Sequence, residues 1–376
     1  MKKLLFAHFL KDTIFFFLLM TLSLGLIVWV IQAVNYLDFM TEDGHGFYVY
    51  FSYTLFNFPK IIHRILPFVF FVSLFYQINK YELRNELIIF WTAGVSKLQF
   101  TKIILIFSLF FSTFQIILGA YISPLGQDNA RNFIRNSNID FFPSLFQEGK
   151  FIDVVKNLTI FIESEEPEGV YNNIFLKELQ PRNGKKSKVI YAQKGTLQNN
   201  KKKRYLELNN GNVINLDGSK TNNFSFEKID FDLSQYSSKS TFFPKIQELN
   251  NEFLLKCLNY YIKGKAYEFK NEFLTCNEDS IKNVKEELLK RFYKPIYLPL
   301  LSLSACLIFF VLGENKRVSL YRYIVFSFGI LIIVISEISL KFVSNSFWGL
   351  SFFVTFPLLS ILSLYIFTHI KSKKNH

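Results

Sequence analysis

The chain has 376 residues, of which 50% are hydrophobic and 46 are Phe, and it carries 43 Lys and Arg against 30 Asp and Glu. Long apolar runs occupy its first and last thirds, and a polar, Lys- and Asn-rich block fills the middle. This segregation excludes a single soluble core and indicates a membrane protein with an inserted soluble domain. The net charge of +13 comes from scattered basic residues without a single patch or motif, which argues against nucleic-acid binding.

The first apolar run, residues 13–34, contains no charge, follows three lysines and lacks a small-residue cleavage site after it. We therefore expect an uncleaved first membrane span. The second run, residues 47–78, is interrupted by prolines and charges near its middle. The remaining spans are expected at residues 103–122, 296–312, 324–340 and 347–370.

Basic residues predict the orientation of these spans. They flank the N-terminus, the loop between spans two and three, the loop between spans four and five, and the C-terminal tail. The first loop instead carries Asp38, Glu42 and Asp43. Because Lys and Arg near span ends are retained in the cytoplasm, both termini of this multi-pass inner-membrane protein are expected there. The large middle block is then extracytoplasmic.

The middle block, residues 123–280, contains short runs rich in β-branched and aromatic residues, at 154–162, 173–179, 188–192, 204–208, 212–216 and 224–233. Turn dipeptides stand at Asn183-Gly184, Asn210-Gly211 and Asp217-Gly218. This pattern predicts an antiparallel sandwich or roll. Residues 249–280 are expected to form either a linker or a helix whose apolar face holds Leu254, Leu255 and Leu258.

The chain has three cysteines. Cys257 and Cys276 fall on the expected extracytoplasmic side, where a disulfide is chemically allowed, but we expect two unpaired thiols. No Cys or His pair has metal-ligand spacing, and no acid pair or nucleophile suggests catalysis. The chain also lacks a P-loop. We therefore expect no metal, no cofactor and no enzymatic activity, so any ATP-driven work must come from a partner.

The loop between spans two and three is the most informative segment. Over residues 81–95, Leu83, Leu87 and Phe90 recur at helical spacing, and Glu82 and Glu86 share an adjacent face. Gly94 is expected to close this helix in the left-handed conformation, and Ser96 to open the next helix with Gln99 as its capping-box partner. Such a helix could couple a partner to both spans, or it could be a solvated helix on the membrane surface.

A second feature is a group of basic residues in the second span, Lys60, His63 and Arg64, expected near the outer level of the bilayer. Charge there needs water, a lipid headgroup or a ligand, so lipid phosphate is a candidate partner. Arg131 and Arg135, one helical turn apart, could extend the same basic rim. The alternative is ordinary snorkelling to the headgroups.

In the fifth span, Glu337 and Lys341 stand at i and i+4, and we expect them to pair with each other.

The loop segment, with Arg84-Asn85-Glu86-Leu87 at its start and Ala93-Gly94-Val95-Ser96 at its end, resembles the Ser-Glu-Leu…Ala-x-Gly-x-Ser segment of the LptF/LptG permeases of the lipopolysaccharide-export ABC transporter. Asn85 stands where the family has Ser. The resemblance in layout covers nearly the whole chain, and further similar positions are Pro59, Leu66-Pro67, Pro124, Glu287, Arg291 and Pro295. Residues 31–38, at the exit of the first span, resemble the F-type more than the G-type subunit.

This resemblance implies an α-helical polytopic membrane protein with six transmembrane helices, three on either side of an inserted periplasmic all-β, jellyroll-like domain. Its expected parts are residues 1–122, 123–280 and 281–376. It implies that the loop helix docks on a cytoplasmic ABC ATPase dimer through Glu86, with Glu82, Leu83, Leu87 and Gly94 in the same segment.

The other implied partners are a paralogous six-span permease subunit, periplasmic jellyroll bridge proteins and lipopolysaccharide. Lipopolysaccharide would enter laterally, its acyl chains against spans one and two and its phosphates against basic residues near the outer surface. Two alternatives remain open. One is a membrane-anchored assembly or sensor protein, and the other is a mechanotransmitting ABC subunit that passes no substrate.

Overall fold

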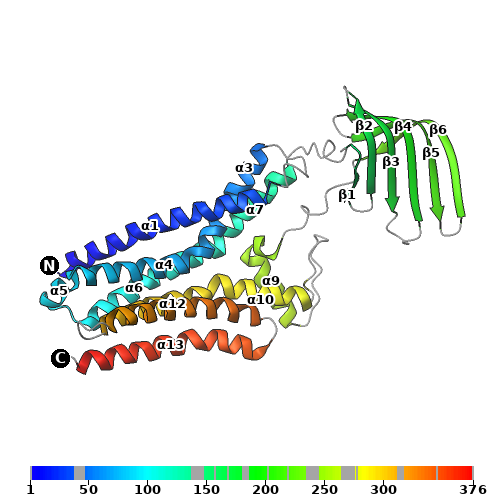
Figure 1. Ribbon diagram of the computed structural model, residues 1–376. Helices are drawn as coiled ribbons and strands as arrows, with labels where there is room; N and C mark the ends of the chain where they lie inside the picture. The colour runs from blue at the N-terminus through cyan, green and yellow to red at the C-terminus, as the bar shows by residue number, and fades with distance from the viewer. Residues whose placement is uncertain are drawn as a thin grey trace. The chain divides into compact units, whose positions relative to one another are not determined.

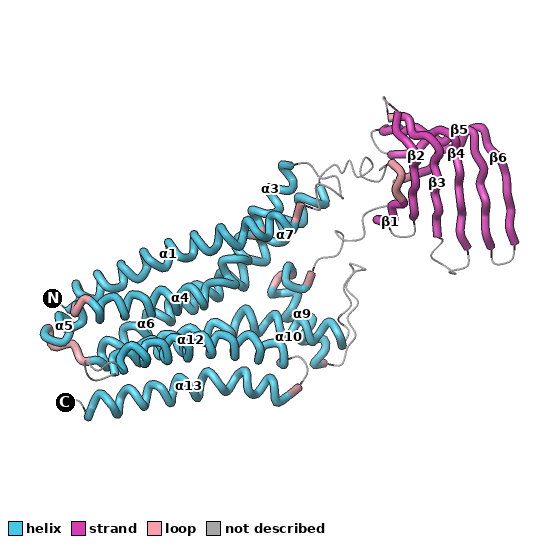
Figure 2. The backbone as a smooth tube through the Cα atoms, in the orientation of Figure 1, coloured by secondary structure: helices cyan, strands magenta, loops and turns pink. Residues whose placement is uncertain are grey.

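A computed structural model describes residues 2–37, 47–136, 148–155, 158–166, 169–179, 186–200, 203–217, 220–233, 245–263, 276, 278–310, 317–343 and 346–374. The chain divides into two compact units. The first, mainly helical unit comprises Met1–Ala33, Thr54–Ala130 and Pro244–His376. The second comprises Val34–Tyr53 and Arg131–Phe243 and holds the β-sheet (Figures 1 and 2).

Six helical segments of the described chain are long and apolar enough to cross a membrane. They confirm the expected three-plus-three arrangement around a central insert. The first is α1 (Lys2–Asn35), the second combines α3 (Phe47–Phe56) with α4 (Phe58–Leu83), and the third runs through α6 (Lys97–Ile117), the π-helix η1 (Leu118–Ile122) and α7 (Ser123–Asn136). The fourth combines α10 (Glu278–Phe292), η3 (Lys294–Ile296), α11 (Tyr297–Cys306) and η4 (Leu307–Phe310), and the last two are α12 (Arg317–Phe342) and α13 (Phe347–Lys374).

The centre of the helical unit is α11, all of whose residues are buried. It contacts α4, α6, α12 and α13. By contrast, α1 leaves most of its apolar side chains uncovered, including Phe15, Leu19 and Leu22 at helical spacing. Because a large uncovered apolar face is stable only against lipid or another protein, α1 lies at the lipid-facing or partner-facing edge of this unit.

The second unit contains one antiparallel sheet whose described strands follow the chain order, β1 (Phe151–Val155), β2 (Leu158–Glu166), β3 (Val170–Leu179), β4 (Lys186–Asn200), β5 (Lys203–Asp217) and β6 (Lys220–Asp232). One face buries alternate residues such as Ile160, Leu176 and Ile190, as expected for a sheet with one apolar side. The prediction of an inserted β domain is confirmed for residues 151–232, whereas α7 and α9 (Asn251–Ile262), at the two ends of the predicted block 123–280, are helical. The jellyroll form is supported only in part, because the described strands make a single up-and-down sheet.

The predicted strands at 204–208 and 212–216 are in fact one strand, β5, so the expected turn at Asn210-Gly211 is wrong. Asn210 has a left-handed φ of 52°, yet pairing continues across it, with Asn209 opposite Lys194 and Gly211 opposite Ala192. The strand can pass this point because Asn and Gly both tolerate unusual backbone angles. Asp217 does end β5, whereas Asn183-Gly184 lies outside the described residues.

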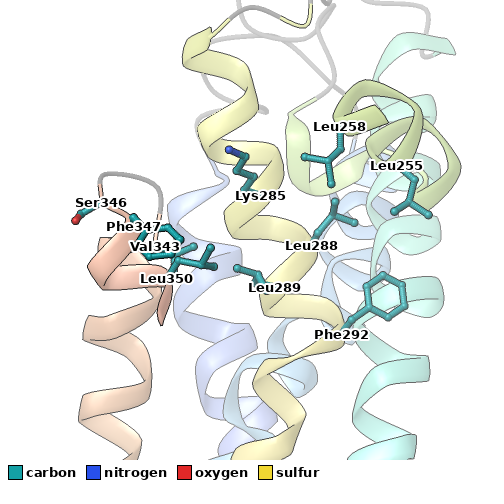
Figure 3. Close-up of a pocket in the computed structure, with 10 residues that line it drawn as sticks. All are labelled: Leu255, Leu258, Lys285, Leu288, Leu289, Phe292, Val343, Ser346, Phe347 and Leu350. Atoms are coloured by element: carbon teal, nitrogen blue, oxygen red, sulfur yellow. The ribbon is translucent and has the colours of Figure 1, made fainter. Parts of the chain in front are cut away.

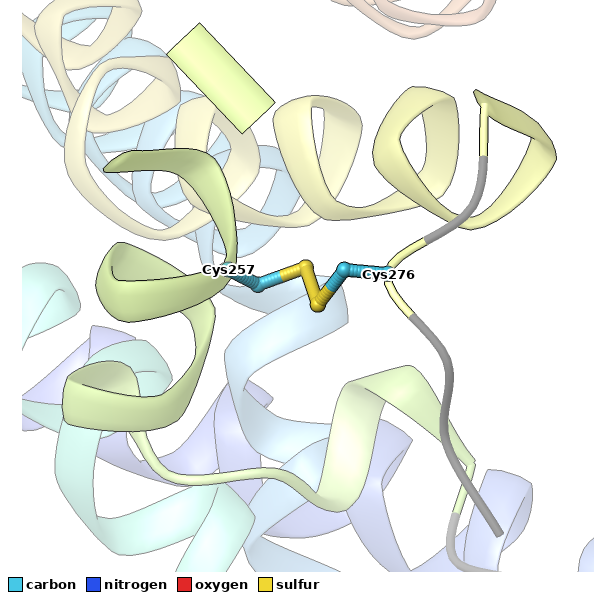
Figure 4. The surroundings of a disulfide bond; sticks show 2 residues. All are labelled: Cys257 and Cys276. Carbon is cyan, nitrogen blue, oxygen red and sulfur yellow. A yellow bond between two sulfur atoms is a disulfide. The ribbon is translucent and has the colours of Figure 1, made fainter. Parts of the chain in front are cut away.

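The return segment contains the short helix η2 (Ile246–Glu248) and α9 (Asn251–Ile262). The helical alternative for residues 249–280 is confirmed over Asn251–Ile262, with Leu254 buried and Leu255 exposed, and residues 264–275 lie outside the described part of the chain. The expectation of unpaired thiols is wrong, because Cys257 and Cys276 form a disulfide with Cα atoms 5.8 Å apart (Figure 4). The cause is tertiary packing: α9 lies against α10, which brings Cys257 next to the start of α10.

Candidate functional site

The loop helix is shorter than its sequence pattern predicts. Span helix α4 continues through Leu83, so Glu82 and Leu83 belong to α4, and the loop helix α5 comprises only Glu86–Thr92. Asn85 separates the two helices with a left-handed φ of 59°. Asn is one of the few residues that adopt this conformation readily, because its short polar side chain bonds locally.

Both predicted end signals of the loop helix are confirmed. Gly94 has a φ of 75°, and the Val95 and Gly94 N–H groups donate to the carbonyls of Phe90 and Trp91, each at 3.0 Å. These are the two hydrogen bonds of a Schellman cap. The Ser96 side chain then accepts from the Gln99 N–H at 3.1 Å, and Gln99 Oε1 accepts from the Ser96 N–H at 3.2 Å.

The inner side of α5 is fixed to several spans. The Phe90 ring lies 5.4 Å from that of Phe6 in α1 and 5.1 Å from that of Phe100 in α6. The Trp91 ring lies 6.0 Å from that of Phe309 at the end of the fourth span. Lys2 Nζ also donates to the Gly94 carbonyl at 2.8 Å. A displacement of α5 would therefore be transmitted directly to spans one, three and four.

The outer side of α5 differs from the one expected. Leu87 is buried in the core, whereas Ile88 and Ile89 are each 52% exposed and form the outward apolar surface together with exposed Leu83. The sequence did contain a signal for this outward apolar surface, because residues 87–90 are all apolar. A short helix that is apolar on every side cannot bury all of its side chains against its own spans, so the remaining apolar side needs another partner.

The acidic residues of the loop are already paired within the chain. Glu86 lies 3.8 Å from the exposed Arg84, and Glu82 lies 3.4 Å from Arg322 of α12. Glu86 is partly exposed and could exchange its partner, whereas the Glu82 pair ties the end of α4 to the fifth span.

The basic group on α4 separates into an inner and an outer part. His63 is 8% exposed and its ring packs onto Gly119 in η1, where an added Cβ would lie 2.3 Å from the imidazole. Lys60 is half-buried and Arg64 exposed, one turn apart on the same helix. The structure therefore leaves Lys60 and Arg64 as the candidate phosphate ligands on α4, with His63 inside the bundle.

Further basic residues that sequence reasoning missed lie near Lys60. Lys245 and Lys290 come from the return segment and from α10 and interact electrostatically with Lys60. Lys294 forms an ion pair with Glu337, which gives Glu337 a partner on the fourth span instead of the expected Lys341. These residues are far apart in sequence, so their spacing gave no signal.

The two arginines of α7 belong to the second unit. Arg131 is buried. The side chain of Arg135 lies outside the described part of the structure. Their expected role at the basic rim stays a prediction.

Arg291, near the end of α10, is 1% exposed and makes four hydrogen bonds. It donates to Glu287 Oε1 at 2.9 Å and to Asn251 Oδ1 at 2.8 Å. It also donates to the carbonyls of Gln247 at 2.8 Å and Leu249 at 3.0 Å. Arg291 thus fixes the chain returning from the sheet domain to the fourth span.

A carboxylate at the start of the first span was also missed. Asp12 Oδ2 accepts hydrogen bonds from Tyr81 Oη at 3.0 Å and from Gln77 Nε2 at 3.3 Å, both on α4. It therefore connects the first and second spans close to the loop helix. Among the described residues, no group of three or more His, Cys, Asp or Glu could hold a metal ion.

Comparison with known proteins agrees with this architecture. The chain is 25% identical over 298 residues to an uncharacterized protein of Rickettsia prowazekii (strain Madrid E), covering 78% of this chain and 77% of that protein. Residues 7–371, which include both sets of spans, the sheet and the loop helix, match the lipopolysaccharide export system permease LptF/LptG family. Since this match extends over nearly the whole sequence, the chain belongs to the lipopolysaccharide export system permease LptF/LptG family.

Proposed function

We propose that this chain is a permease subunit that extracts lipopolysaccharide from the inner membrane and passes it to a periplasmic bridge, driven by a partner ATPase. The observation that carries the proposal is the loop helix α5. Its outward side carries exposed Ile88 and Ile89 and partly exposed Glu86, while Phe90 and Trp91 pack against three spans. A rigid element of this kind can convert movement of a docked partner into movement of the spans.

The proposed orientation places α5 and both chain termini in the cytoplasm and the sheet domain in the periplasm. Basic residues near the span ends support this arrangement. The Cys257–Cys276 disulfide adds independent support, because Cys257 belongs to α9, which lies at the end of the helical unit opposite α5 (Figure 1), and disulfides persist in oxidising compartments.

For the substrate, we propose that acyl chains lie against the uncovered face of α1 and the neighbouring second span, and that lipid phosphates contact Lys60 and Arg64. The apolar surface suits acyl chains, and the two cations suit phosphate. The proposed partners are a paralogous six-span subunit, an ABC ATPase dimer and periplasmic jellyroll bridge proteins. The F-type assignment from residues 31–38 stays a prediction.

The test is a detergent pull-down of the tagged full-length chain from its native membrane, with co-purified proteins and ATPase activity measured. Wild type is expected to bring down an ATPase and a second six-span subunit. Glu86→Ala and Ile89→Glu are expected to reduce ATPase recovery at least about tenfold, because both alter the proposed contact at its centre. Glu227→Ala removes an exposed carboxylate from β6 and serves as the matched control.

The outcomes separate the alternatives. If no ATPase is recovered with wild type, the assembly or sensor function replaces transport. If the ATPase is recovered but photoreactive lipopolysaccharide fails to crosslink near Lys60 and Arg64, a mechanotransmitting subunit without substrate passage is favoured instead.

A further inference from the structure

An apolar pocket of about 660 Å³ lies beside α10 in the helical unit. Figure 3 shows α10 between α9 on one side and the start of α13 on the other. The residues that line the pocket include Leu255 and Leu258 of α9, Leu288 and Phe292 of α10, and Val343 and Phe347 near the junction of α12 and α13. This volume falls within the roughly 300–1,000 Å³ typical of ligand sites.

The pocket is strongly asymmetric in its chemistry. Apart from Lys285 and Ser346, the side chains that line it in the described part of the chain are apolar. Lys285 and Phe292 lie seven residues apart on α10, so their backbone positions are about 10 Å apart along the helix. A ligand that satisfies both must therefore carry an anion at one end and a hydrocarbon chain at the other.

The position of the pocket fits the surface layer of a bilayer. The charged half of α10 passes here into the apolar fourth span. Trp348, which is 82% exposed, stands at the start of the sixth span, and exposed Trp at a span end is typical of the membrane–water interface. The Lys285 ammonium lies 5.4 Å from the centre of the Tyr261 ring, which holds it on the α9 side.

We propose that this pocket binds one acyl chain of an anionic glycerophospholipid, with the lipid phosphate at Lys285. A free phosphate would leave the apolar walls unused, and a lipid with several phosphates would exceed the one cation among the described lining residues. In this proposal the phospholipid stays bound in the pocket beside α10 as part of the structure and is not transported. The inference goes beyond the proposed transport function and does not depend on it.

The disulfide holds α9, which forms one side of this pocket, in place. Cys257 lies between Leu255 and Leu258 on α9, and its bond to Cys276 fixes α9 beside the start of α10 (Figure 4). Cys257 itself packs with Ile281 and Val284 of α10. Reduction should therefore loosen the α9 wall and weaken lipid binding without changing any lining residue.

The experiment uses the full-length chain in phosphatidylcholine nanodiscs that contain a minor amount of phosphatidylglycerol with a photoreactive group at one acyl-chain end. After illumination, peptide mapping is expected to find adducts at residues 285–292 and 343–350. Labelling is normalised to residues 324–334 of α12, which report ordinary surrounding lipid. Replacing the probe by photoreactive phosphatidylcholine should lower the normalised labelling.

Lys285→Glu is expected to reduce this labelling about fivefold, equivalent to the roughly 1 kcal/mol that one lysine contributes near an anionic surface. Lys285→Arg should retain it. Lys282→Glu, which reverses an exposed charge on the same helix outside the pocket, is the matched control. Because positions 282 and 285 are both exposed, these variants are expected to fold, as size-exclusion chromatography would check.

Equal labelling by the two phospholipids, or labelling that Lys285→Glu leaves unchanged, would overturn the proposal. So would the absence of adducts from these two peptides. Specific labelling by photoreactive lipopolysaccharide in place of phosphatidylglycerol would also overturn it and assign the pocket to the transported lipid.

Discussion

At the scale of single residues, buried Arg291 holds together α10 and the segment that returns from the sheet domain. Its guanidinium bonds to Glu287 and Asn251 and to two carbonyls of the return segment, so five donors in a planar fork are nearly all used. A lysine would carry the same charge but could not reach these partners together. The arginine is therefore required for its geometry as well as for its charge.

Arg291→Met is expected to lower the free energy of unfolding by about 3 kcal/mol, because it leaves the two buried carbonyls without this donor and the Glu287 carboxylate with Lys290 alone. Thermal unfolding of the purified chain in detergent measures the loss. The double variant Arg291→Met with Glu287→Gln should recover part of this loss. If the double variant is as unstable as the sum of two independent substitutions, the pair is not coupled as the geometry indicates.

The residues that sequence reasoning identified correctly were those with local signals. Gly94, Ser96 and Gln99 have roles set by neighbours within five positions, and all three adopt the expected conformations. Lys245, Lys290 and Lys294 gave no such signal, because their relation to Lys60 or Glu337 exists only after folding.

At the scale of the elements, backbone geometry at asparagine misled the sequence prediction twice. Asn85 breaks a helix that the apolar pattern continued, and Asn210 lies inside a strand that the turn dipeptide divided. In both cases φ is positive. The same local conformation can therefore end an element or lie within it. At Asn210 the strand continues because β5 pairs with β4 on both sides of this residue. These pairing partners are distant in sequence, so residues 210–211 alone could not predict a continuous strand.

Gly211 illustrates what the paired strands require. A Cβ at this position would lie 2.1 Å from the Tyr191 carbonyl oxygen and 3.0 Å from the Ala192 Cα, both in the backbone of β4. Gly211→Val is therefore expected to destabilise the sheet by about 1–3 kcal/mol, the usual range for overpacking. Limited proteolysis between residues 186 and 233 measures the effect.

The neighbouring Asn212→Val provides the control, because Asn212 is exposed and valine favours a strand. It should leave the rate of cleavage unchanged or lower it. Equal protection of the Gly211→Val variant and wild type would show that β4 and β5 can separate enough to accept a side chain.

At the scale of the whole molecule, hydropathy and composition were sufficient to predict six spans and a β insert. These features depend on sums over many residues, so local errors in the ends of elements did not affect them. Which spans lie at the centre was not predictable. The central α11 and the largely uncovered α1 are similarly apolar in sequence, and packing distinguishes them.

The proposed orientation predicts which positions react with a membrane-impermeant maleimide in intact spheroplasts. Arg84→Cys, at the exposed turn before α5, should react only after the membrane is permeabilised. Asn212→Cys, on the exposed side of β5, should react at once. Native cysteines give little background, because two form the disulfide and Cys306 is buried. The opposite pattern would reverse the orientation and contradict the proposed ATPase contact.

The disulfide also sets an order of events during biogenesis. In the proposed orientation, Cys257 and Cys276 meet an oxidant only after the whole insert has been translocated, and they precede the apolar part of the fourth span. Oxidation of this pair therefore marks a chain whose second half is entering the membrane. Cells that cannot oxidise periplasmic thiols would accumulate a full-length but immature permease, distinguishable from the mature protein by its mobility on a non-reducing gel.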